Sequence, residues 1–267
     1  NAEIIRVANQ TGVPAQMMKN IFSRESQFWP GIYDRVYEAG LGHLSEQGAD
    51  TVLLWNPSFF SQFCPLILSE ESCQRGFGNL DPDQQALLRG ALVQQVNAQC
   101  PDCPTGIDLS QANFSISVFA RSLLANCEQV GQIVYNSTGR QAGQVATYED
   151  LWKFTLVNYH AGPGCLGNAM QRAIGNDQRL TWENVYPYLE EGCRTGFDYV
   201  QDIAAMPDAD ETGIGDLLST AEPVPYLPTP TYPPTPWPTR TPTRIPATSK
   251  PGPSPTPRPS STPPIYP

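Results

Sequence analysis

Residues 12–29 read GVPAQMMKNIFSRESQFW and form the clearest helical pattern in the chain. Pro14 is suited to the first turn of a helix, where the missing proline N–H would have no partner. Apolar side chains follow at helical spacing, namely Met17, Met18, Ile21 and Phe22. Glu25 comes one turn after Ile21, so its carboxylate is expected on or beside the buried face. A carboxylate there is costly without a partner or a purpose, which makes Glu25 the first candidate functional residue.

Further helices are predicted on both sides of this segment. Their ranges are 3–10, 82–96 after the capping Asp81, about 113–127, 148–160, about 165–174 and 182–206. The glycine-rich stretch 40–48 and residues 56–80 show no clear periodicity and are expected to be irregular. Few segments alternate between polar and apolar residues as strands do, so the folded body is predicted to be mainly α-helical.

The composition divides the chain into two unequal parts. Of its 28 prolines, 18 follow Ala221, in Pro-Thr repeats that lack the apolar residues needed for a core. We therefore expect one folded domain over 1–206, with a cysteine-containing insertion around 56–106, and a disordered Pro/Thr-rich segment over 207–267. That segment is either an extended linker or stalk in polyproline II conformation or a solvated tail.

Charge and hydropathy argue against two classes of partner. The net charge is −10, and four basic residues against one acid in the tail leave about −13 for the body. A body this acidic argues against nucleic acid as a partner. No uninterrupted apolar run approaches about 18 residues, so no membrane span is expected.

Seven cysteines predict up to three disulfides, one unpaired thiol and an oxidising compartment. They are Cys64, Cys73, Cys100, Cys103, Cys127, Cys165 and Cys193. Cys100 and Cys103 are spaced for a disulfide or for half of a zinc site, but no second pair follows at zinc-finger distance, which favours a disulfide. The chain begins with Asn1 rather than Met, so we interpret it as a processed product or a fragment. We expect a secreted, cell-surface or cell-wall protein.

Three short segments carry motifs that are weak singly and fairly specific as a set. Arg24–Phe28 reads RESQF, Ala39–Leu44 reads AGLGHL and Asn158–Gly164 reads NYHAGPG. In this order they resemble the Glu-Ser, Gly-Leu-Met-Gln and Tyr-Asn-Ala-Gly motifs of lytic transglycosylases and goose-type lysozymes. The similarity covers residues 1 to about 55 and 107–175.

The resemblance implies a single lysozyme-like domain with a cleft for peptidoglycan glycan strands. In that family the matching glutamate protonates the bond between N-acetylmuramic acid and N-acetylglucosamine, then acts as base while a 1,6-anhydro ring closes. By this resemblance Glu25 is the catalytic residue, and we expect a monomer that needs no cofactor and no metal. The implied substrate-binding residues are Ser26, Asp34, Gly40, Leu41, His43, Tyr159 and His160.

Two histidines depart from the family pattern. His43 stands at the position of the family's glutamine, His160 at that of its asparagine, and Gly42 replaces the methionine. They are the only histidines in the chain, and we expect both to hydrogen-bond N-acetyl or carbonyl groups of the sugar. A metal site built from both histidines and Glu25 is the alternative, but it would remove the catalytic acid.

Three further alternatives concern the chemistry itself. Asp34 precedes Gly40 much as an Asp-Arg pair precedes the second motif in goose-type lysozymes. In the cleft Asp34 would allow hydrolysis in place of ring closure; otherwise it is a solvated loop acid. The alternative role for Glu25 is an ion pair with Arg35. The alternative to an enzyme is a non-catalytic wall-binding module with the same fold.

Overall fold

The computed structural model describes residues 1–32 and 38–205, all within the first of the chain's two units, Asn1–Ser219. These residues are mainly helical, as the sequence predicts, and they contain isolated β-bridges but no strand. The predicted Pro/Thr-rich segment 207–267 lies outside the described residues, and so does Asp34.

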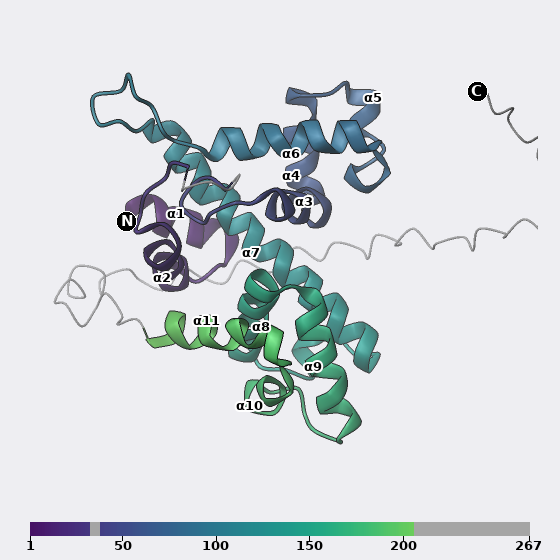
Figure 1. The fold of residues 1–267 in the computed structure, drawn as a ribbon. Helices are drawn as coiled ribbons and strands as arrows, with labels where there is room; N and C mark the ends of the chain where they lie inside the picture. Colours follow the sequence, from purple (N-terminus) through teal and green to yellow (C-terminus); the bar gives the residue numbers. More distant parts are fainter. Residues whose placement is uncertain (33–37, 206–267) are drawn as a thin grey trace, which may run out of the picture. The chain divides into compact units, whose positions relative to one another are not determined.

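Eleven α-helices make up the described part of the chain (Figure 1). They are α1 (Ala2–Thr11), α2 (Ala15–Ser26), α3 (Glu46–Trp55), α4 (Pro57–Phe63), α5 (Glu70–Cys73), α6 (Pro82–Val96), α7 (Leu109–Thr138), α8 (Tyr148–Ala161), α9 (Pro163–Gly175), α10 (Trp182–Val185) and α11 (Arg194–Ala205). Short 3-10 helices lie between some of them, at Cys64–Leu66, Phe77–Asn79, Ala142–Gln144, Tyr186–Tyr188 and Glu191–Cys193.

Local sequence explains where two of the predicted helices start and stop. The side chain of Asp81 caps α6 by accepting the backbone N–H of Gln84 at 2.9 Å. Thr147 and Asp150 form a reciprocal capping box at the start of α8. That helix ends at Gly162, whose φ of 90° is a conformation that glycine adopts without strain. Both helices match the ranges expected from the sequence.

The prediction of irregular structure holds for residues 40–45, but it is wrong for 46–48 and for most of 56–80. The stretch 40–48 contains the start of α3, which Ser45 caps by accepting the N–H of Gly48 at 3.1 Å. Residues 56–80 hold α4 and α5. The buried residues of α4 are Phe59, Phe60 and Phe63. These short helices are stabilised by packing of such apolar faces rather than by propensity, so the local pattern alone did not reveal them.

Two helices differ in length from their predicted ranges. The helix expected over 182–206 is divided into α10 and α11, with two 3-10 turns between them. Pro187 lies in the first of these turns and lacks the N–H that a continuous α-helix needs. The helix expected over about 113–127 extends in both directions to become the 30-residue α7. Asp108 caps its start by accepting two backbone N–H groups at 2.8 and 3.2 Å.

Helix α7 contributes to both apolar clusters found in the described residues. The first cluster joins α7 to α1, α2 and α8–α11, and Phe22, Leu123 and Tyr199 are fully buried within it. The second joins α7, through Val118, to α3, α4 and α6. Figure 1 shows α7 running through the fold, with α3 and α6 beside one part of it and α8 and α9 beside the other. The burial of these apolar faces is the main stabilising contribution to the fold.

Three disulfides are present, Cys64–Cys73, Cys100–Cys103 and Cys165–Cys193. Among the candidate disulfide residues, Cys127 is the one that stays unpaired, and it is half-buried on α7. Burial raises the pKa of the Cys127 thiol, which keeps it protonated and unreactive. The expectation of three disulfides and one thiol is confirmed.

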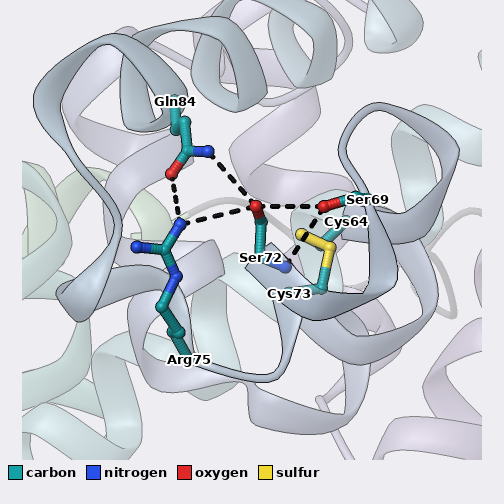
Figure 2. The surroundings of a disulfide bond; sticks show 6 residues. All are labelled: Cys64, Ser69, Ser72, Cys73, Arg75 and Gln84. Atoms are coloured by element: carbon teal, nitrogen blue, oxygen red, sulfur yellow. Dashed lines mark hydrogen bonds between the residues drawn. A yellow bond between two sulfur atoms is a disulfide. The ribbon is translucent and has the colours of Figure 1, made fainter.

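Polar contacts connect the first of these disulfides to α6 (Figure 2). The hydroxyl of Ser72 accepts a hydrogen bond from the side-chain amide of Gln84 at 3.3 Å. Arg75 donates to the oxygen of the same amide at 2.9 Å. These bonds hold the segment that carries Cys73 to the start of α6. Cys73 itself packs against the second apolar cluster, so this part of the cysteine-bearing insertion belongs to the folded domain.

Candidate active-site cleft

A cleft of about 430 Å³ opens where α2, α3, α7 and α8 meet the loop before α3. Its lining consists of Glu25, Glu38, His43, Leu44, Ser45, Gln47, Gly48, Thr51, Asn126, Gln129, Asn158, Tyr159, His160, Gly162 and Pro163. Four residues singled out from the sequence are among them, namely Glu25, His43, Tyr159 and His160. The structure thus brings together side chains from three separate segments of the chain.

Glu25 lies in the last turn of α2, and its side chain is 20% exposed. One of its carboxylate oxygens is 3.8 Å from Nδ1 of His43. The neighbouring Arg24 does not neutralise it, because Arg24 pairs with Asp202 of α11. The other arginine considered as a partner, Arg35, lies outside the described residues. Glu25 is therefore a partly accessible carboxylate on the cleft wall.

Ser26, Gly40 and Leu41 lie behind the cleft wall and are not among its lining residues. The hydroxyl of Ser26 is 2.8 Å from the carbonyl oxygen of Leu41, and the hydroxyl of Ser115 accepts the Leu41 N–H at 3.0 Å. Gly40 has a φ of 78°, and a Cβ at this position would collide with the Ser115 hydroxyl. These contacts position the loop that carries His43.

Gly42 and Tyr159 hold the same loop against α7 and α8. A Cβ at Gly42 would overlap the ring of Phe119, so an aromatic ring fills the space that a larger side chain would need. Tyr159 donates its hydroxyl to the carbonyl oxygen of Gly42 at 2.7 Å. The rings of Phe119 and Tyr159 meet edge to face, with centroids 5.8 Å apart. Tyr159 thus links α8 to the residue next to His43.

The carboxylates of Glu25 and Glu38 approach the same ring nitrogen of His43. Its Nδ1 is 3.8 Å from a carboxylate oxygen of Glu25 and 3.9 Å from one of Glu38. The backbone of His43 is left-handed, with a φ of 46°, which costs of order 1–3 kcal/mol for a residue other than glycine. Sequence reasoning missed Glu38; its position directly before the Ala39–Leu44 motif was the available signal.

The aromatic rings of Tyr159, Tyr199 and His160 adjoin Glu25, and desolvation disfavours the charged form of each. Burial, and then the nearby Glu25 charge, raise the pKa of Tyr159 well above its usual value. Tyr199 of α11 was not identified from the sequence; burial and the neighbouring Tyr159 raise its pKa as well. His160 stacks on Tyr199 with ring centroids 4.3 Å apart. Burial lowers the pKa of His160, and this effect outweighs the opposing influence of Glu25.

Three carboxamides, from Asn126, Gln129 and Asn158, also line the cleft. The side-chain nitrogen of Asn158 donates to the oxygens of Asn126 and Gln129 at 2.7 and 2.8 Å. None of these residues was identified from the sequence. The one available signal was that Asn158 directly precedes Tyr159 in the third motif.

Comparisons with known proteins leave the geometry as the main guide to function. No protein-family model, curated protein or solved structure matches this chain. Among residues 1–32 and 38–205, no three His, Cys, Asp or Glu side chains are grouped as metal ligands would be. No helix in the same residues is long and apolar enough to cross a membrane.

Proposed function

We propose that this protein cleaves the β-1,4 bond between N-acetylmuramic acid and N-acetylglucosamine in peptidoglycan, by lytic transglycosylation within a lysozyme-like fold. The supporting observation is that Glu25, His43, Tyr159 and His160, which come from three separate segments of the chain, line one cleft. A glycosidic bond held there would lie beside the carboxyl group of Glu25, with Glu38 also in the lining, and beside several hydrogen-bonding side chains. Acid–base cleavage of a sugar bond needs such a set.

Glu25 carries the proton transfers in this proposal. Its carboxyl group donates a proton to the glycosidic oxygen, and the bond between that oxygen and C1 of the muramyl sugar breaks. The Glu25 carboxylate then accepts the proton of the muramyl 6-hydroxyl while the hydroxyl oxygen bonds to C1 and closes the 1,6-anhydro ring. No water is consumed and Glu25 returns to its starting state, so a single carboxyl group acts as acid and then as base.

The neighbours of Glu25 suit this role. Arg24 is paired with Asp202, and the Glu25 side chain is 20% exposed, so its carboxyl group is accessible from the cleft. Desolvation disfavours the charged forms of Tyr159 and His160, so neither adds charge beside the reacting oxygen. The single O–H of Tyr159 is used for Gly42, which leaves the phenol oxygen as an acceptor for the substrate. Tyr159 also holds the loop of His43 through its bond to Gly42.

Hydrolysis is the second candidate reaction, and Glu38 is the observation that favours it. Glu38 and Glu25 each lie within 4 Å of the same nitrogen of His43, at 3.9 and 3.8 Å. Their nearest oxygens are therefore closer together than the upper limit of roughly 9.5 Å for the two carboxyl groups of an inverting glycosidase. In that reaction Glu38 would activate a water molecule while Glu25 protonates the leaving oxygen.

Digestion of purified peptidoglycan tests the proposal. The products of the native protein and of the Glu25→Gln and Glu38→Gln variants are separated and identified by mass spectrometry. We expect 1,6-anhydromuramyl ends, lost in Glu25→Gln and retained in Glu38→Gln. Glu128→Gln, at an exposed carboxylate of α7 outside the cleft lining, is the matched control.

Each other outcome has a definite meaning. Reducing ends that disappear in Glu38→Gln would establish hydrolysis instead of ring closure. Binding of glycan strands without any cleavage by the native protein would overturn the enzymatic proposal and favour a non-catalytic wall-binding module.

The proposed setting is outside the cytoplasm, at the cell wall or in the secreted fraction, with peptidoglycan glycan strands as the partner and the monomer as the active form. Three disulfides support this setting, because such bonds persist in oxidising compartments.

A further inference from the structure

The three carboxamides of the cleft form a hydrogen-bonded group that the proposed proton transfers do not use. Asn158 of α8 is only 2% exposed, and Asn126 and Gln129 lie one turn apart on α7. The side-chain nitrogen of Asn158 donates to Oδ1 of Asn126 at 2.7 Å and to Oε1 of Gln129 at 2.8 Å. Both protons of that nitrogen are therefore in use.

A backbone carbonyl determines which way round all three carboxamides lie. Nδ2 of Asn126 donates to the carbonyl oxygen of Ser122, one turn earlier in α7, at 2.8 Å. Asn126 therefore presents its oxygen to Asn158, and Asn158 presents its nitrogen in return. Gln129 must present its oxygen to the same nitrogen, because the opposite orientation would place two donors together.

This arrangement leaves one acceptor and one donor for a ligand. Oδ1 of Asn158 is buried and has no hydrogen-bond partner within the described residues. Gln129 uses its oxygen for Asn158, and its Nε2 donates to no group of the described residues. Native proteins leave few buried acceptors unpaired, because such groups are costly. Asn158 is one of the residues that line the cleft, so a ligand bound there could supply the missing donor.

We propose that Asn158 and Gln129 recognise the 2-acetamido group of a hexosamine. Oδ1 of Asn158 accepts the acetamido N–H, and Nε2 of Gln129 donates to the acetamido carbonyl oxygen. A secondary amide offers one donor and one acceptor on separate atoms, whereas a hydroxyl offers both from a single atom. The inference rests on the proposed function and deepens it, because it names Asn158 and Gln129 as the residues that select an N-acetylated sugar at this position.

The charge of the cleft agrees with a neutral substituent. No lysine or arginine is among the described residues that line it, whereas Glu25 and Glu38 both are. A carboxylate or phosphate group on the ligand would therefore meet like charge without a cation to compensate. An acetamido group carries no charge and meets no such repulsion.

Binding measurements on protein that carries Glu25→Gln test the inference without turnover. Isothermal titration calorimetry compares an oligomer of β-1,4-linked N-acetylglucosamine with an oligomer of β-1,4-linked glucose of the same length, which has a hydroxyl in place of each acetamido group and is also uncharged. We expect the acetylated oligomer to bind about tenfold or more tightly. Adding Gln129→Met or Asn158→Leu should bring the ratio of the two affinities close to one. Adding Gln132→Met, the same change on α7 outside the cleft lining, should leave the ratio unchanged.

Two results would overturn the inference: no binding of the acetylated oligomer, or an unchanged ratio in a Gln129→Met protein with a native unfolding midpoint. Gln129 is only half-buried, so its variant keeps the test decisive if Asn158→Leu does not fold. Cleavage of peptidoglycan by the native protein is measured separately. If the protein prefers the acetylated oligomer but does not cleave peptidoglycan, the proposed function is wrong and this inference stands. If it cleaves peptidoglycan but the ratio of the two affinities is unchanged in Gln129→Met, this inference is wrong and the proposed function stands.

Discussion

The cleft contains two groups of polar side chains that are held in opposite ways. The acid group consists of Glu25, Glu38 and His43, and the amide group consists of Asn126, Gln129 and Asn158. The acid group lies at a helix end and on a loop, and its side chains are between 12% and 36% exposed. The amide group lies within α7 and α8 and is neutral. The carboxylates to which we assign proton transfer thus keep access to solvent, whereas the carboxamides to which we assign recognition are held by helices.

The largest effect should come from removing the acid. Glu25→Gln keeps the shape of the side chain but cannot donate or accept the proton, so the rate of glycan cleavage should fall by about 10²- to 10⁴-fold. Mass-spectrometric quantification of released muropeptides measures the rate. The unfolding midpoint of the variant should match that of the native protein. Full activity in Glu25→Gln would remove the acid group from the mechanism.

The loop of the acid group should be less tolerant of added volume than the rest of the protein. Gly42→Ala places a methyl group against the ring of Phe119, and such overpacking costs about 1–3 kcal/mol of unfolding free energy. Gly90→Ala is the matched control, because a Cβ there meets nothing within 4 Å inside α6 and should stabilise the helix by up to about 1 kcal/mol. Urea denaturation measures both, and equal effects would argue against the contact with Phe119.

The bond between α8 and the same loop should contribute a smaller amount. Tyr159→Phe leaves the buried carbonyl oxygen of Gly42 without its donor, so the free energy of unfolding should fall by about 1–2 kcal/mol. Tyr135→Phe serves as the control, because Tyr135 is exposed on α7. Denaturant titration compares the two variants, and a loss no larger than that of Tyr135→Phe would show that the bond does not hold the loop.

The smallest effect should be a pH dependence that originates at His160. Its pKa in the folded protein lies below the ordinary value of 6.5 because burial disfavours the charged ring. The unfolded chain therefore binds more protons as the pH falls through 6.5, and the folded state loses stability until the lower pKa is passed. Glu25 opposes this shift and Arg24 adds to it. The loss between pH 8 and pH 5 should be smaller in His160→Phe, which keeps a ring against Tyr199. If the free energy of unfolding from urea denaturation depends on pH identically in the native protein and in His160→Phe, His160 is not the origin of the pH dependence.

Helices with a strong local signal were the most predictable part of the fold. Apolar spacing after Pro14 located α2, and Asp81 located the start of α6. The helix α3 was missed although Ser45 caps it, because Gly40 and its neighbouring glycines favoured a loop. Short helices form only when tertiary packing adds to a weak local preference, and the sequence of one segment does not show what that segment packs against.

The candidate site was predictable only where a motif marked it. The motifs pointed to Glu25, His43, Tyr159 and His160, and the structure places all four on one cleft. Glu38 lacked a motif and a periodic context, so it was missed. Ser26, Gly40 and Leu41 belong to the motifs but are not among the residues that line the cleft. A motif shows which residues recur together, and it does not show which of them face the cleft.

By itself, the sequence determined the helical character of the body, the ends of helices such as α8, and the cysteine count that allows three disulfides with one thiol. These features depend on interactions between residues close in the chain, such as the capping box of Thr147 and Asp150. Only the tertiary structure decided that Asn158 meets Asn126 and Gln129, and that Glu38 approaches His43. Which faces of α7 and α8 touch depends on how the whole apolar cluster packs, and no local pattern contains that information.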